Sequence, residues 1–221
     1  MSFNPQEAKL EAFYYFPTVI YSIKKTEFLS AALPVAQEFI DKRKQDQELN
    51  ELYPAYMTDN LHADPRIAPL AQFIAQTGWN ILNEQGYNMQ PLSTFFTEFW
   101  CQEHYRHSAM EQHVHGYGAQ LVGFYFLECP EDCSRVVFHD PKSGKVMINL
   151  RETDPTKVTH ASNQINFKPE PGQLMLTNSW LAHSFTRHAS ITPMKFIHFN
   201  IAVQVTAPVV PAPCQVAAEV V

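Results

Sequence analysis

The stretch AQLVGFYFLE, from Ala119 to Glu128, decides the fold class of this chain. It is rich in aromatic and branched apolar residues, which favour β-strands. Short strands that are separated by turns, with no helical pattern between them, predict an antiparallel barrel or a double-stranded β-helix, the jelly roll. The chain is therefore predicted to be mainly β with flanking helices. Further strands are predicted at residues 92–101, 135–139, 145–149, 173–177 and 195–204.

The residues before this region carry helical patterns. A first strand is predicted within residues 13–23, followed by a helix over residues 27–44 that Pro34 should kink or break. A second helix should begin after Asp64, a good N-cap residue, and end near Glu84. We expect both helices to lie against one face of the sheet.

These patterns divide the chain into three parts. Residues 1–90 should form an N-terminal strand and helices that pack on the core, and residues 91–206 should form the jelly-roll core. Residues 207–221 are rich in Pro, Ala and Val and are predicted to be a flexible tail.

The overall composition narrows the classes of partner and location. The net charge is −6 without a basic patch, which argues against nucleic-acid binding. No apolar run is long enough to span a bilayer, and the N-terminus lacks a signal pattern, so a cytoplasmic protein without membrane contacts is expected. The four cysteines match neither a disulfide framework nor a zinc site, and we expect them to be reduced.

A histidine pair carries the most specific chemical signal. His113 and His115 are two residues apart, so on an extended segment both side chains point the same way. His183, from a later strand, would complete one face of an octahedral metal site and leave three positions open, as in non-haem iron oxygenases. Five of the ten histidines lie between residues 104 and 139, so a chance pair is the alternative interpretation.

In this respect the sequence resembles the Fe(II)/2-oxoglutarate-dependent oxygenases. More narrowly, it resembles an oxygenase family related to prolyl hydroxylases and found in marine bacteria and phages. The similarity covers roughly residues 95–203, and each matching stretch is weak alone but occurs in the family's order. The matching stretches are EQHVH (111–115), GFYFL (123–127), FHDP (138–141), PGQL (171–174), SWLAH (179–183) and FN (199–200).

The resemblance implies a cofactor, a cosubstrate and their binding residues. His113, His115 and His183 would hold Fe(II), and 2-oxoglutarate would chelate two further positions. Lys195, which lies 12 residues after His183, would pair with the remote carboxylate of 2-oxoglutarate, where the superfamily more often has Arg. Tyr125 resembles a tyrosine that helps to bind the cosubstrate, although a plain core aromatic is an equally good interpretation.

The sequence departs from the wider superfamily at one ligand. That superfamily usually has Asp or Glu as the second member of the pair, where this chain has His115. The resulting set of three histidines is neutral, which should change iron affinity and redox potential. Asp140 is the reserve candidate for a carboxylate ligand, and a turn residue before Pro141 is its simpler interpretation.

These observations lead to one predicted function and two alternatives. The prediction is an Fe(II)- and 2-oxoglutarate-dependent dioxygenase that hydroxylates a C–H bond of a small-molecule substrate or of a prolyl or other peptidyl substrate. The first alternative is a three-histidine metal dioxygenase that does not use 2-oxoglutarate. The second is a non-catalytic jelly-roll binding protein. Jelly-roll oxygenases often pair, so a homodimer is one expectation for a chain whose sequence leaves the oligomeric state open.

Overall fold

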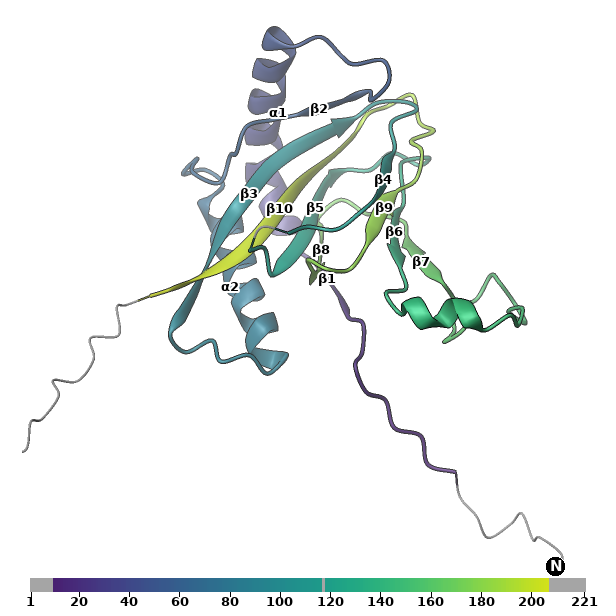
Figure 1. The fold of residues 1–221 in the computed structure, drawn as a ribbon. Coiled ribbons are helices and arrows are strands. Elements are labelled where there is room, and N and C mark those ends of the chain that lie inside the picture. Colours follow the sequence, from purple (N-terminus) through teal and green to yellow (C-terminus); the bar gives the residue numbers. More distant parts are fainter. Residues whose placement is uncertain (1–9, 117, 207–221) are drawn as a thin grey trace, which may run out of the picture.

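The computed structural model describes residues 10–116 and 118–206 as two facing antiparallel sheets with helices on one side (Figure 1). This arrangement confirms the predicted jelly roll. The predicted tail, residues 207–221, lies outside the described residues. The larger sheet has the order β1 (Ile20–Lys24), β8 (Gln173–Asn178), β5 (Leu121–Glu128), β10 (Met194–Val205), β3 (Leu92–His104) and β2 (Ala55–Met57). The smaller sheet has the order β4 (Met110–His113), β9 (His183–Phe185), β6 (Val136–His139) and β7 (Gln164–Phe167).

The two predicted helices are present, with shifted starts. After a short 3-10 turn, η1 (Thr26–Phe28), helix α1 (Leu29–Asp46) continues through Pro34 without a break. Helix α2 (Ala68–Glu84) ends where predicted but starts later than Asp64, whose side chain instead accepts the Arg66 backbone N–H at 2.9 Å. No helix within the described ranges is both long and apolar enough to cross a membrane.

The larger sheet separates two apolar cores. The helices pack on its outer face, where residues such as Ile40, Ile74 and Phe99 are buried. The second core lies between the sheets and includes Phe124 and Phe196. A residue on the larger sheet therefore faces either the helices or the smaller sheet, according to its place in the strand alternation.

Strand β10 shows this alternation most clearly. Met194 and Phe196 belong to the core between the sheets, while Ile197 and Phe199 belong to the core under the helices. His198 lies on the inner face, with its ring 5.7 Å from that of Phe124. The strand thus presents a different set of side chains to each layer.

The prediction of a strand at residues 145–149 was wrong. The structure has a 3-10 helix there, η2 (Ser143–Met147), within the long connection between β6 and β7. Val146 and Met147 are each 84% exposed, so their apolar side chains do not mark a buried strand. Four short strands, β2, β4, β7 and β9, were not predicted, because three or four residues give little periodic signal.

Candidate metal centre

The fold brings together the three histidines that the sequence indicated. His113 is the last residue of β4 and lies opposite His183, the first residue of β9, in an antiparallel pair. His115 follows two residues after His113. The ring centroids are 4.5 Å apart for His113 and His183, 5.1 Å for His113 and His115, and 5.2 Å for His115 and His183. Their potential ligand atoms all lie within 4.8 Å of one another, which is close enough to share one ion.

Hydrogen bonds fix the orientation of two of these rings. His113 Nδ1 lies 2.8 Å from the Glu111 carbonyl oxygen, and His183 Nδ1 lies 2.9 Å from the Leu181 carbonyl oxygen. A carbonyl oxygen only accepts, so each Nδ1 carries the proton and donates it. Each Nε2 then keeps its lone pair, which is the form that binds a metal.

The remaining nitrogen atoms indicate that a metal fits this site. His183 Nε2 and His115 Nε2 are buried and have no hydrogen-bond partner among the described residues. Buried polar atoms without a partner are costly, so they point to a missing group. Three imidazole nitrogens that converge on one point suit Fe(II) and similar divalent ions. We therefore consider the donor set compatible with a resident metal ion.

Burial keeps these rings neutral. It lowers the pKa of His183 to about 3 and the pKa of His115 to about 4. Both rings are therefore uncharged at neutral pH, so metal binding does not require either ring to lose the extra proton of an imidazolium.

The same burial predicts that the metal-free protein loses stability in mild acid. Burial also lowers the pKa of His104, a non-ligand, to about 3. In the unfolded chain these histidines titrate near pH 6.5. Below that pH the unfolded state therefore binds more protons than the folded state, which lowers the free energy of unfolding. Their contribution is complete above about pH 6.5 and is lost as the pH falls toward 4 and 3, by roughly 1 kcal/mol per pH unit for each histidine.

Urea unfolding of the metal-free protein at pH 7 and pH 5.5 measures this effect. His104→Gln should flatten the pH dependence, because one titrating group is removed from the core. Equal free energies of unfolding at the two pH values would contradict the assignment.

A second group of polar residues lies behind His115, and sequence reasoning missed it. Asn200 Nδ2 lies 2.9 Å from His115 Nδ1 and 2.5 Å from Glu98 Oε2. His198 Nε2 lies 3.3 Å from the same carboxylate oxygen, and the hydrogen bond from His198 holds the pKa of Glu98 below its usual value. The alternation of β10 was the available signal, since it places His198 and Asn200 on one face.

Lys195 does not lie near the triad. Its position on β10 alternates with that of His198, so its side chain is on the helix side of the larger sheet. Lys195 Nζ lies 2.6 Å from Glu128 Oε2 and donates to Gln37 Oε1 on α1 at 2.7 Å. The prediction that Lys195 pairs with 2-oxoglutarate therefore disagrees with its placement. The inward positions of β10 from 194 to 200 hold no lysine or arginine.

Tyr125 and Asp140 are also engaged elsewhere. Tyr125 is part of the core under the helices, and its hydroxyl donates to the Lys25 carbonyl oxygen at 2.6 Å. It is therefore a core aromatic on the face away from the histidines. Asp140 lies 2.8 Å from Lys145 Nζ and is not part of the group of potential metal ligands, so His115 is the third ligand that the geometry offers.

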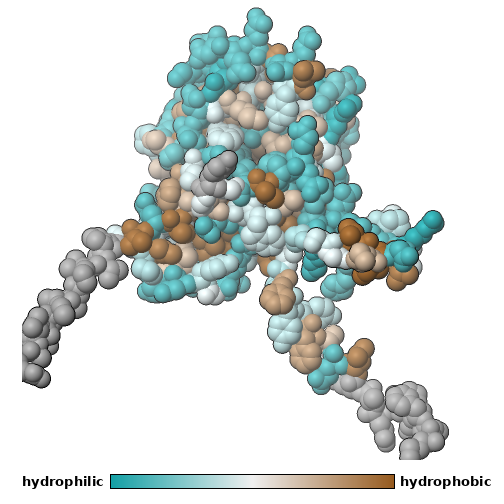
Figure 2. Space-filling model, in the orientation of Figure 1, coloured by the Kyte–Doolittle hydropathy of each residue, from teal (hydrophilic) through white to brown (hydrophobic). Residues whose placement is uncertain are grey.

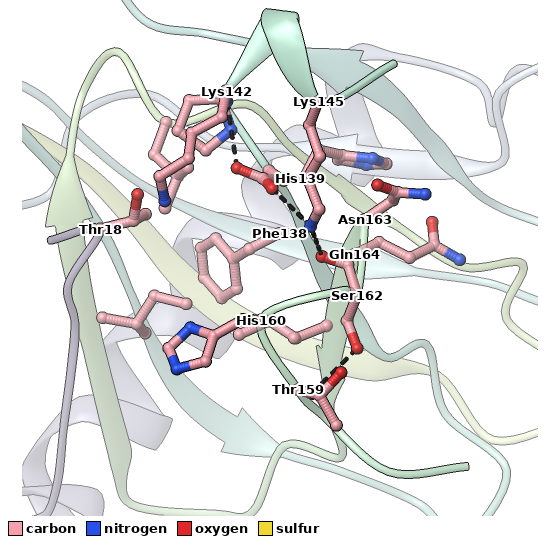
Figure 3. Close-up of a pocket in the computed structure, with 15 residues that line it drawn as sticks. Thr18, Phe138, His139, Lys142, Lys145, Thr159, His160, Ser162, Asn163 and Gln164 are labelled. Carbon is pink, nitrogen blue, oxygen red and sulfur yellow. Dashed lines mark hydrogen bonds and ion pairs between the residues drawn. The ribbon is translucent and has the colours of Figure 1, made fainter. Parts of the chain in front are cut away.

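A cavity of about 220 Å³ lies near the site, although none of the three histidines is among its lining residues (Figure 3). Its wall includes Phe138 and Leu181, and the Phe138 ring centroid is 6.2 Å from that of His183. The close-up shows polar and apolar residues together in the lining. Lys145 Nζ donates hydrogen bonds to Asp140 Oδ2 and to the Ser162 carbonyl oxygen. The connection between β6 and β7 supplies much of this wall.

Comparison with known families gives one match. The family described as "Putative 2OG-Fe(II) oxygenase" matches residues 98–200, a range that holds all three histidines and also Glu98 and Asn200. None of the curated proteins compared with the chain matches it.

Solved structures share the fold at low sequence identity. AviO1 from Streptomyces viridochromogenes has a TM-score of 0.60 and 13% identity, over 89% of this chain and 93% of that one. A prolyl-4-hydroxylase from Pseudomonas putida has a TM-score of 0.55 and 11% identity, over 84% and 93%. HygX from Streptomyces hygroscopicus, solved with nickel and 2-oxoglutarate, has a TM-score of 0.52 and 12% identity, over 84% and 83%.

Proposed function

We propose that this chain is a 2OG-Fe(II) oxygenase that hydroxylates a C–H bond of a prolyl or other peptidyl substrate, and its match to that family over residues 98–200 supports the proposal. The observation that carries the proposal is the convergence of His113, His115 and His183, two of them with a buried Nε2 that lacks a partner among the described residues. These three residues would hold the iron. Bound Fe(II) and 2-oxoglutarate supply the oxidising chemistry, and the protein contributes binding and orientation.

The surroundings of the triad exclude water from one side of the site. His183 is fully buried and packs against Phe124, with ring centroids 5.5 Å apart, and against Phe138. The backbone carbonyls of Glu111 and Leu181 hold two of the rings in position. Such preorganisation keeps the ligand geometry constant and protects a reactive centre from side reactions.

The shape of the neighbouring surface supports a peptidyl substrate. The cavity that Phe138 separates from His183, at about 220 Å³, is smaller than the roughly 300–1,000 Å³ of typical small-molecule sites, so it suits a single side chain. The loop around η2 exposes apolar residues next to it, and Figure 2 shows hydrophobic side chains on this projecting loop. Exposed apolar patches commonly bind partner chains. The exposed residues are Val146, Met147, Ile148 and Leu150.

Turnover with peptides tests this proposal. We expect a panel of proline-containing peptides, supplied with Fe(II), 2-oxoglutarate and oxygen, to include members that gain one oxygen atom by mass spectrometry and form an equal amount of succinate. Thr18→Trp should block this coupled turnover, because Thr18 lines the cavity, without changing iron affinity. Thr156→Trp, at an exposed position outside the cavity wall, is the matched control.

Two results would overturn the assignment of substrate class. One is oxygen transfer to small molecules but to no peptide in the panel. The other is full peptide turnover by the Thr18→Trp variant, which would place the substrate elsewhere on the protein.

A further inference from the structure

His115 is held differently from the other two histidines. His113 and His183 each donate Nδ1–H to the backbone carbonyl two residues earlier, whereas His115 Nδ1 faces the side chain of Asn200. Backbone carbonyls fix a tautomer whatever the surrounding side chains are. The tautomer of His115, by contrast, depends on the side chains behind it.

Those side chains form a chain of contacts that ends in a carboxylate. Glu98 on β3 pairs with Asn200 on β10 in the sheet register, immediately before the irregularity between Asn200 and Ile201. Asn200 is 4% exposed and His198 is 3% exposed, whereas the Glu98 side chain is 34% exposed, so only the carboxylate end of the chain reaches water. Glu98 Oε2 lies 4.0 Å from His115 Nδ1 and accepts hydrogen bonds from Asn200 and His198.

Ligation by His115 Nε2 requires a proton on Nδ1 and therefore an acceptor that faces it. Glu98 Oε2, at 4.0 Å, lies beyond hydrogen-bonding distance of His115 Nδ1. The acceptor that can reach this nitrogen is Asn200 Oδ1, which is buried without a partner among the described residues. The oxygen and nitrogen of an asparagine amide exchange places by a rotation of the amide group. Asn200 Nδ2 contacts both His115 Nδ1 and Glu98 Oε2, so the rotation that turns Oδ1 toward the ring also requires the Glu98 carboxylate to shift away from Oδ1.

The charge balance of the site also indicates a role for Glu98. Three neutral imidazoles bring no negative charge to a divalent ion. A carboxylate that is hydrogen-bonded behind a ligating histidine raises the basicity of that ligand and contributes charge at short range. In this site Glu98 does not bond to His115 directly and reaches it through Asn200, whose side chain contacts both residues.

We propose that Glu98 and Asn200 are positioning residues of the metal site, which orient His115 with its Nε2 toward the metal and supply the negative charge that the ligand set lacks. This inference rests on the proposed metal-dependent function. It assigns Glu98 a role behind the ligand His115, although its carboxylate oxygen also lies within 4.8 Å of potential ligand atoms of His115 and His198.

Metal titration of otherwise identical variants tests the inference. Isothermal titration with Co(II), and with Fe(II) under anaerobic conditions, should show a roughly 10- to 100-fold loss of affinity for Glu98→Gln. Asn200→Ala should show a similar loss of metal affinity. Asn200 lies on a different strand from Glu98 and takes part in the same contact, so if one variant misfolds, the other still tests the inference. The visible spectrum of bound Co(II) should change in both variants, because the orientation of His115 changes.

Charge rescue and a control separate this role from a structural one. The double variant Glu98→Gln/Asn200→Asp returns a carboxylate to the network and should recover most of the lost affinity. Glu128→Gln, a carboxylate on the helix side of the sheet, should bind metal like the wild type. If both Glu98→Gln and Asn200→Ala bound metal as tightly as the wild type, the inference about the positioning residues would be wrong and the proposed function would stand. If the wild type bound no metal, the proposed function itself would be wrong.

Discussion

Replacing His113 by alanine is expected to lower Fe(II) affinity by more than about 100-fold. Loss of a residue that only hydrogen-bonds to a metal ligand typically lowers metal affinity by about 10- to 100-fold, and loss of a ligand should cost more. The variant removes one of three converging nitrogens, and a two-histidine remnant does not make a facial site. His113 ends β4, an edge strand of the smaller sheet, and is partly exposed. The free energy of unfolding of the metal-free variant should therefore change by about 1 kcal/mol or less. Anaerobic calorimetric titration with Fe(II) measures the affinity.

His160→Ala is the matched control for this prediction. His160 is an exposed histidine outside the triad, so its loss should leave iron affinity unchanged. If His113→Ala bound Fe(II) as tightly as the wild type, the metal would have to lie elsewhere.

Replacing Lys195 by methionine should destabilise the protein and leave 2-oxoglutarate affinity unchanged. Lys195 Nζ contacts Glu128 at 2.6 Å and Glu103 at 3.6 Å, and the side chain of Glu103 is only 3% exposed. Glu103 keeps a second partner, Lys44, at 2.7 Å, so we expect a loss of about 2 kcal/mol, below the 3–5 kcal/mol typical of a buried carboxylate left alone. Urea denaturation measures this loss.

Calorimetric titration of the Fe(II) form with 2-oxoglutarate separates the two roles of Lys195. The donor for the remote carboxylate should come from the inner face, where Trp100 Nε1 is buried with no partner among the described residues. The Trp100 ring is 5.1 Å from that of His198. A large loss of cosubstrate affinity in Lys195→Met, with stability unchanged, would contradict the placement of this lysine on the helix side.

The jelly roll and the grouping of the three histidines into one candidate site could both be predicted from the sequence. Long strands such as β5 and β10 have clear apolar patterns, and the pair His113 and His115 needs only a local extended backbone to face one way. The side of the sheet on which Lys195 lies could not be predicted in this way. Strand alternation puts Lys195 on the face of β10 opposite to that of His198. Only the packing of the helices decides which face of β10 is the inside of the jelly roll.

The residues behind His115 required long-range information. Glu98 and Asn200 are 102 positions apart, and their contact depends on the register between β3 and β10. No local pattern specifies that register. The false strand at residues 145–149 has a related cause, since its apolar residues lie on an exposed loop.

The most direct test of the central claim is the anaerobic addition of Fe(II) and then 2-oxoglutarate to metal-free protein, followed by visible absorption. We predict the weak charge-transfer band of iron chelated by 2-oxoglutarate in the wild type and in His160→Ala, and its loss in His183→Ala. Iron binding without a band would contradict chelation of the cosubstrate at this site. A band that persists in His183→Ala would contradict the assignment of the three histidines as the metal ligands.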